Sequence, residues 1–230
     1  MGRKINMKLR VIYEDNHLLV VEKIPNILSQ ADNTNDIDML SICKNYIKEK
    51  YNKPGNVYLG LVHRLDRPVG GVMVFAKTSK AASRLSDQVR TRKMKKTYRA
   101  VVNGVCDKSG VYMDYLIKNK RTNMVRVVDK NNKESKQAKL SYSLISTQKY
   151  KDNFYSLVEI NLHTGRPHQI RVQFSSRGHA LFGDQRYSNY AKIGEQIALW
   201  STKLELIHPT TKEEMCFVTE MPNTFPWNLF

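Results

Sequence analysis

Residues 61–76, which read LVHRLDRPVGGVMVFA, constrain the fold of this chain most. A single carboxylate, Asp66, stands before a proline, a glycine pair and a short apolar run at residues 72–76 that is typical of a buried strand. We therefore expect Asp66 on a turn at the edge of the core. Burial raises the pKa of a carboxyl group, whereas a cationic neighbour such as Arg64 or Arg67 keeps it ionised. An ionised, partly desolvated aspartate is suited to nucleophilic attack.

The same residues also fit an ordinary turn without chemistry. Aspartate bonds its own backbone, proline fixes one dihedral angle, and glycine frees the next. From these residues alone, the turn is the commoner explanation.

The length and composition predict one domain, residues 1–230, because no Gly- or Pro-rich linker and no repeat divides the chain. Apolar residues make up 41% of the sequence, yet none of the apolar runs approaches the ~20 residues of a membrane span. The first ten residues are basic and lack the continuous apolar segment of a signal peptide, so we expect a cytoplasmic protein without membrane association.

Three cysteines, Cys43, Cys106 and Cys216, lie far apart, with no C-x-x-C pair. This spacing predicts neither a disulfide framework nor a zinc site, and burial as small apolar side chains is the simplest role for them. No phosphate-binding loop or dinucleotide fingerprint is present either.

The net charge of +17, from 38 Lys and Arg against 21 Asp and Glu, favours a polyanionic partner. Charge alone does not separate RNA from DNA or from an anionic membrane surface. Six basic residues between 90 and 99 lead into a strand pattern that carries Tyr98. Such a run is commonly a solvated face, but a basic edge with an aromatic side chain also suits nucleic acid.

Residues 163–178, HTGRPHQIRVQFSSRG, form the second informative stretch. Pro167 suits the first turn of a helix and Gly178 its end, with His168 and Arg171 on one face. In the preceding turn, where Thr164 and Arg166 stand, free backbone N–H groups are placed to hold a phosphate. Taken alone, this is also compatible with an ordinary basic helix.

Apolar patterns predict the remaining elements. We expect a hairpin at residues 10–22, a helix at 39–51 capped by Asp36 or Asp38, and a helix at 80–90 after Thr78. Further strands are expected at residues 57–62, 97–104, 110–128, 138–146, 154–162, 197–209 and 215–218, and the aromatic tail from residue 222 should pack on the body.

The two stretches together resemble the RluA-type pseudouridine synthases. Residues 63–71 are similar to that family's H-R-L-D-x-x-T-S-G motif, with Val69 and Gly70 in place of Thr-Ser. Residues 162–171 match L-x-T-G-R-x-H-Q-I-R at every fixed position. Two motifs in the right order, about a hundred residues apart, are more specific than either alone.

The resemblance extends over residues 10–222. Residues 13–25 resemble Y-E-D-x-x-L-L-V-V-x-K-P with one extra residue before the proline, and residues 96–104 resemble K-x-Y-x-A-x-V-x-G. Gly183-Asp184 with Tyr187 is similar to G-D-x-x-Y. Residues 199–209 follow L-H-A-x-x-L-x-F-x-H-P, except that Trp200 and Ser201 replace His-Ala.

The family resemblance implies an α+β fold: a long mixed, mainly antiparallel sheet with flanking helices and a central catalytic cleft. It implies a catalytic domain without an S4 module, because the pattern begins by residue 10. The expected activity is isomerisation of specific uridines in structured rRNA or tRNA. The resemblance implies that this redox-neutral reaction needs no cofactor and no metal. The expected partner is RNA, with no obligate protein partner and a monomeric enzyme.

The resemblance also assigns site residues. It implies Asp66 as the nucleophile, Tyr98 stacked on the target uracil and able to assist loss of the C5 proton, and Arg171 paired with Asp66. Residues implied in contacts with the RNA or the base are His63, Arg64, Arg67, Thr164, Arg166, His168, Gln169 and Leu199.

Two alternatives stay open. An RNA-binding or RNA-remodelling protein that uses the fold without chemistry would fit the departures at Val69-Gly70 and Trp200-Ser201. A metal-dependent nuclease using Asp66 and His63 is weaker, because no second carboxylate is near in sequence.

Overall fold

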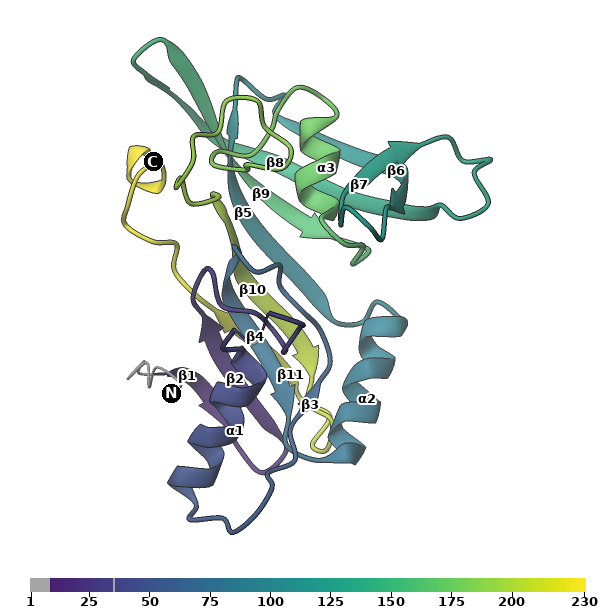
Figure 1. Ribbon diagram of the computed structural model, residues 1–230, viewed down its shortest axis with the longest axis vertical. Coiled ribbons are helices and arrows are strands. Elements are labelled where there is room, and N and C mark those ends of the chain that lie inside the picture. Colours follow the sequence, from purple (N-terminus) through teal and green to yellow (C-terminus); the bar gives the residue numbers. More distant parts are fainter. Residues whose placement is uncertain (1–8, 35) are drawn as a thin grey trace.

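A single sheet runs the length of the molecule in the computed structural model, which describes residues 9–34 and 36–230 (Figure 1). The strands are β1 (Arg10–Glu14), β2 (Leu18–Lys23), β3 (Gly60–Leu61), β4 (Gly70–Ala76), β5 (Lys95–Asn103), β6 (Ser109–Lys118), β7 (Val125–Val128), β8 (Lys136–Tyr150), β9 (Asn153–Leu162), β10 (Leu199–Ile207) and β11 (Glu214–Val218). The helices are α1 (Met39–Lys50), α2 (Ser79–Arg90), α3 (Gln169–Ser175) and the 3-10 turn η1 (Trp227–Leu229).

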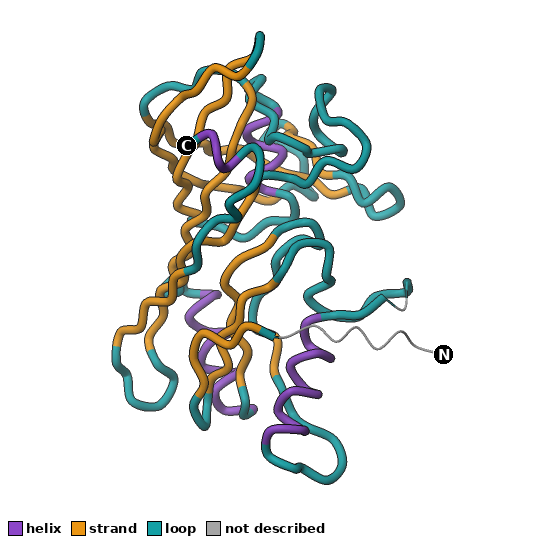
Figure 2. The backbone as a smooth tube through the Cα atoms, turned by 90° about the vertical axis from the view of Figure 1, so that its left-hand side faces the viewer, coloured by secondary structure: helices purple, strands orange, loops and turns teal. Residues whose placement is uncertain are grey.

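The strand order is β1-β2-β4-β10-β5-β9-β8-β6-β7, with β11 added to β10 and β3 to β4. Among these described strands, β4 and β10 pair in parallel and the other pairs are antiparallel. The predicted α+β fold with a mixed, mainly antiparallel sheet is therefore confirmed. Figure 2 shows the strands continuing from one half of the molecule to the other.

The central strands are buried on both faces, which explains their continuous apolar runs. Every residue of β4 is buried. Helix α1 packs on one face through Met39, Cys43 and Ile47, next to Met73 and Phe75 of β4. Helix α2 covers the other face through Ala81 and Leu85, and its cluster includes Val72 and Val74.

Both predicted helix caps are present. The Asp38 carboxylate accepts from the Ser41 backbone N–H, and the Thr78 hydroxyl accepts from the Ala81 N–H. Each cap satisfies a donor that the first turn leaves without a partner.

Helix α3 lies against the other half of the sheet, where Phe174 packs on Tyr112 and Tyr142 with ring centroids 5.1 and 5.2 Å apart. It begins at Gln169, two residues later than the sequence predicts, because His168 adopts a left-handed backbone conformation with φ of 51°. Pro167 therefore belongs to the turn before the helix.

Two other predicted elements differ in the structure. The strand expected at residues 57–62 is reduced to Gly60–Leu61, and the one expected at 110–128 divides into β6 and β7. The division falls at a turn in which the Asn119 side chain accepts from the N–H groups of Arg121 and Thr122. The aromatic tail packs on the body as predicted, with Trp227 buried beside Trp200.

Candidate active site

Asp66 lies on the turn that leads into β4, as expected. The turn is closed by a hydrogen bond from the Val69 N–H to the Asp66 carbonyl at 3.0 Å. The preceding Leu65 is held at both backbone groups by the Ser29 hydroxyl, at 2.7 and 3.1 Å. The Asp66 side chain is 31% exposed. The carboxylate thus stands at the edge of the core on a fixed backbone.

Lys23, at the end of β2, fastens this turn from beneath. Its side chain is fully buried. The ammonium donates to the carbonyls of Ile24 at 3.2 Å, Arg67 at 2.9 Å and Val69 at 2.7 Å. Burial lowers the pKa of Lys23 to about 7, although the nearby Asp66 carboxylate opposes that shift. Sequence reasoning assigned Lys23 no role, although it belongs to the first matched motif.

Arg171 of α3 contacts two carboxylates. Nε and Nη2 donate to the two oxygens of Asp184 at 2.8 and 2.7 Å, and Nη1 donates to Asp66 at 3.4 Å. The predicted pairing of Arg171 with Asp66 is confirmed. Burial alone would lower the pKa of Arg171, but Asp184 and then Asp66 raise it. Two-point contact with Asp184 fixes the guanidinium plane, so that its remaining N–H groups face Asp66.

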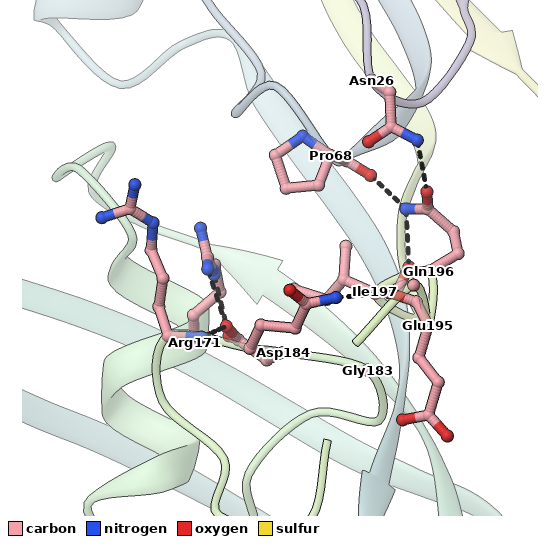
Figure 3. A pocket seen from close by; sticks show the side chains of 11 residues that line it. Asn26, Pro68, Arg171, Gly183, Asp184, Glu195, Gln196 and Ile197 are labelled. Carbon is pink, nitrogen blue, oxygen red and sulfur yellow. Dashed lines mark hydrogen bonds and ion pairs between the residues drawn. The ribbon is translucent and has the colours of Figure 1, made fainter. Parts of the chain in front are cut away.

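Asp184 is the second residue that sequence reasoning missed. It is fully buried and lies on the loop between α3 and β10, where Figure 3 shows it beside Arg171. The signal was available in the Gly183-Asp184 motif, but nothing in the sequence says that this carboxylate faces Arg171.

Tyr98 reaches the same place from β5. It pairs in register with Ser201 of β10, whose neighbour Gly71 belongs to β4. Tyr98 is buried, and burial followed by the Asp66 charge raises the pKa of its phenol. The hydroxyl therefore keeps its proton at neutral pH. In the sheet, β10 lies between β4 and β5. This order brings the Tyr98 ring of β5 close to the Asp66 turn, which precedes β4.

His168 is fixed beside Arg171. Its Nδ1 and the Tyr187 hydroxyl are 2.8 Å apart, and the Arg171 guanidinium carbon lies 5.2 Å from the centre of the Tyr187 ring. Burial lowers the pKa of His168, and Asp66 opposes the shift. The motif residues Asp184 and Tyr187 thus both serve to hold Arg171.

Three residues that were predicted to contact RNA form hydrogen bonds within the turn before α3: Thr164, Arg166 and Gln169. The Thr164 hydroxyl donates to Gln169 Oε1 at 2.7 Å, and Arg166 Nε donates to the Gln137 carbonyl at 2.9 Å. Gln169 is buried and also accepts from the Arg166 backbone N–H. These bonds shape the turn, and the contacts of these three residues with RNA stay a prediction.

His63 also differs from its expected role. It is buried, and Nε2 accepts from the Val74 backbone N–H at 3.1 Å. This bond gives the Val74 N–H group of β4 a partner just beyond the point where the pairing with β3 ends. Burial lowers the pKa of His63 well below its ordinary value, so the ring is neutral. His63 therefore supports the sheet behind Asp66 instead of facing RNA.

The remaining predicted residues lie around the turn. Arg64 is exposed next to Asp66, and Arg67 forms an exposed ion pair with Asp36 at 2.8 Å. Leu199 is buried in the same apolar cluster as Tyr98.

The two departures from the family pattern are in contact with each other. Gly70 pairs with Trp200 in the parallel ladder, and a Cβ on Gly70 would lie 2.1 Å from the Trp200 ring. The Trp200 Nε1 donates to the Thr219 hydroxyl, within a cluster separate from that of Tyr98. The glycine makes room for the indole, so both replacements belong to one packing arrangement.

A cavity of about 340 Å³ lies next to the ion pair of Arg171 and Asp184 (Figure 3). Arg171 and Asp184 line it on one side. On the other side the Asn26 side chain donates to Gln196 at 2.9 Å, and Gln196 donates to the Pro68 carbonyl at 2.5 Å. These bonds tie the loop before β10 to the Asp66 turn.

Within residues 9–34 and 36–230, no group of three or more His, Cys, Asp or Glu side chains is placed to hold a metal ion. In that same part of the chain, none of the helices combines the length and apolar character of a membrane span.

Comparison with known proteins identifies the family of this chain. A family model described as RNA pseudouridylate synthase matches residues 17–176. An uncharacterised RNA pseudouridine synthase of Aquifex aeolicus is 33% identical over 230 residues, covering 96% of this chain and 72% of the relative. Ribosomal large subunit pseudouridine synthase D of Zymomonas mobilis is 31% identical, with coverages of 94% and 70%. The tRNA pseudouridine synthase C of Vibrio parahaemolyticus is 28% identical, with coverages of 95% and 93%.

A solved structure, human RNA pseudouridylate synthase domain containing 4, shares the fold with a TM-score of 0.76 at 21% identity, covering 93% of this chain and 88% of the human chain. The chain belongs to the RNA pseudouridine synthase family and is an isomerase. Within that class, the predicted resemblance to the RluA-type enzymes is confirmed.

Proposed function

We propose that this protein isomerises specific uridines of structured ribosomal or transfer RNA to pseudouridine, with Asp66 as the nucleophile. The observation that carries the assignment of Asp66 is its contact with Arg171, whose charge Asp184 secures. The relatives named above act on ribosomal and transfer RNA by name, which supports both as substrate classes.

The reaction breaks the N1–C1′ glycosidic bond, turns the uracil and joins C5 to C1′, while the C5 proton is lost and N1 gains one. Atoms and electrons balance within the nucleotide, so the scheme requires no cofactor. The carboxylate has three available routes: attack on C1′, addition to C6, or removal of a sugar proton. Each route begins with the Asp66 carboxylate, and the Arg171 guanidinium 3.4 Å away supplies the opposite charge beside it.

Tyr98 holds the base in this proposal. Its phenol keeps its proton because the pKa is raised by burial and by Asp66. A neutral aromatic ring at the site stacks on the extruded uracil, and Leu199 of the same apolar cluster supplies a second contact. Assistance with loss of the C5 proton would require the phenol to give up its own proton first, so stacking is the primary role.

The exposed Arg64 fills the gap that the extruded uridine leaves in its stack. Removing a base from its stack costs a few kcal/mol, and a guanidinium beside the nucleophile offsets part of that cost. Arg67 and the basic surface hold the backbone. We further propose that the enzyme works as a monomer in the cytoplasm, without an obligate protein partner; gel filtration and cell fractionation test both points.

The non-catalytic alternative draws no support from the departures. Trp200 and Gly70 pack on each other and leave Asp66, Tyr98 and Arg171 at the site. The isomerase therefore remains the proposed function.

The test is substitution of Asp66. We expect Asp66→Asn to abolish pseudouridine formation in RNA from cells lacking this protein, while RNA affinity changes less than about twofold, because only the ionised carboxylate is lost. Since asparagine can deamidate back to aspartate, Asp66→Ala is assayed in parallel. Asp87→Asn, an exposed carboxylate on α2, is the matched control. Turnover by Asp66→Ala would remove Asp66 from its role.

A further inference from the structure

A second and larger cavity, of about 680 Å³, lies in the half of the molecule that carries α3 and the β8–β9 hairpin. Its walls come from the end of β5, the turn between β8 and β9, the loop between α3 and β10, and the C-terminal tail. Such a volume is within the range of ordinary ligand sites. Neither Asp66 nor Arg171 lines it.

Aromatic side chains dominate this cavity: Tyr150, Phe154, Tyr155, Phe182, Tyr190 and Phe225. Four of them are exposed, and Tyr190 is exposed over 76% of its surface. Single exposed apolar residues are normal on a protein, whereas a gathered group marks a binding surface. The Phe225 ring contacts Tyr150 and Phe182 with centroids 5.0 and 5.2 Å apart, which fixes one wall.

The charges around these rings suit RNA. The Lys149 ammonium lies 5.8 Å from the centre of the Phe154 ring, and that of Lys151 lies 5.5 Å from the Tyr150 ring. Lys151 and Lys192 line the cavity, as do Asp152 and Glu195. Carboxylates repel a phosphate but accept hydrogen bonds from the amino groups of a base. The combination therefore fits a base inside the cavity and the RNA backbone over the lysines.

The loop between α3 and β10 joins this cavity to the active site. Gly183 and Glu195 line both cavities; Arg186 faces the first, and Tyr190 the second. The loop is braced where Gly183 passes Gln196, since a Cβ on Gly183 would lie 2.4 Å from the Gln196 carbonyl oxygen. The second cavity therefore adjoins, across this loop, the cavity that Arg171 lines.

We propose that the second cavity binds an unpaired nucleobase of the RNA strand that carries the target uridine, stacked on Tyr150 and Tyr190. The proposal rests on the proposed function in taking RNA as the substrate. It adds a binding site that lies outside the catalytic cluster and recognises single-stranded RNA.

Binding of a fluorescent single-stranded oligouridylate of about 12 nucleotides, followed by anisotropy, tests the site. Stacking on one aromatic side chain corresponds to about 5- to 160-fold in affinity, so Tyr150→Ala/Tyr190→Ala should weaken binding by at least the lower value. Both side chains are exposed, so the fold should tolerate their removal. Tyr58→Ala, also exposed but in the other half, is the matched control and should change nothing.

Unchanged affinity in the double variant, or no binding of the probe by the wild type, would overturn the proposal. A 4-thiouridine probe supplies a second readout: crosslinks are expected within residues 149–155 or 185–195, and crosslinks confined to the Asp66 turn would count against the cavity. If a protein partner occupied the second cavity instead, the probe would neither bind nor crosslink there.

Steady-state kinetics separates this proposal from the isomerase itself. On cellular RNA the double variant should raise KM and leave kcat unchanged, because the cavity lies outside the chemical step. An inactive wild type whose probe binding still depends on Tyr190 would refute the isomerase and keep the cavity. An active wild type whose KM equals that of the double variant would support the isomerase and refute the binding role of the cavity.

Discussion

Gly70 and Trp200 illustrate how one residue sets the conditions for another. A glycine at the start of a buried strand looks permissive in sequence, but here it leaves space for an indole on the adjacent parallel strand. The family pattern has larger and smaller side chains, respectively, at these two positions. We therefore expect the contribution of each residue to stability to depend on the other.

A double-mutant cycle tests that dependence. Gly70→Ser should lower the free energy of unfolding by about 1–3 kcal/mol through overpacking against the indole. Trp200→His should cost about 3 kcal/mol through the lost packing. In the combined variant, urea unfolding should reveal a coupling of about 1–3 kcal/mol in the stabilising direction. Gly165→Ser, where the new side chain meets open space, is the control. Strictly additive values would show that the two sites are independent.

At the scale of elements, Glu14 connects β1 to α1 and to the end of β4. Its carboxylate accepts from Tyr46 at 2.9 Å, Lys50 at 2.7 Å, Tyr51 at 2.8 Å and Lys77 at 2.7 Å. Burial alone would raise the pKa of Glu14, but these bonds lower it to about 2. The ionised form is therefore part of the folded structure, and α1 is held to the sheet by charge as well as by apolar packing.

Acid should reveal this contribution. A carboxylate with a lowered pKa stabilises the fold above the unfolded value near 4.5, and that stability is lost as the pH falls toward about 2. Glu14→Gln should cost about 2 kcal/mol at pH 7 and should flatten the fall between these limits, as followed by urea unfolding at each pH. Glu49→Gln, an exposed residue on α1, should retain the wild-type profile. The same slope in both variants would exclude Glu14 as the cause.

For the whole molecule, the excess of positive charge is the dominant property. A net charge of +17 on 230 residues favours RNA binding through phosphate contacts over a broad surface. The two cavities share Gly183 and Glu195 of the loop between α3 and β10.

Salt dependence measures those phosphate contacts. For the single-stranded probe, log affinity should fall with log salt by about 0.7 per contact. Tyr150→Ala/Tyr190→Ala should lower the affinity at every salt concentration and keep the slope, because stacking releases no counterions. A methylphosphonate oligonucleotide, which lacks the backbone charge, is the control and should show little slope. A flat response of the charged probe would argue against the basic surface as the RNA platform.

Local signals in the sequence determined much of this protein. The hairpin, the caps at Asp38 and Thr78, the buried strand after Asp66 and the order of the motifs all depend on neighbouring residues, and each is where the pattern predicts. The pairing of Arg171 with Asp66 was available through the family resemblance. Capping and periodicity act over a few residues, which is why a single sequence reveals them.

Only the tertiary structure decided the rest. The two-point contact of Asp184 with Arg171, the position of Lys23 beneath the turn and the burial of His63 each join segments that local patterns do not relate. The contact between Gly70 and Trp200 requires the parallel register of β4 and β10. Strand register and loop paths are set by packing across the whole sheet, so the surroundings of the catalytic residues and the second cavity follow from the fold.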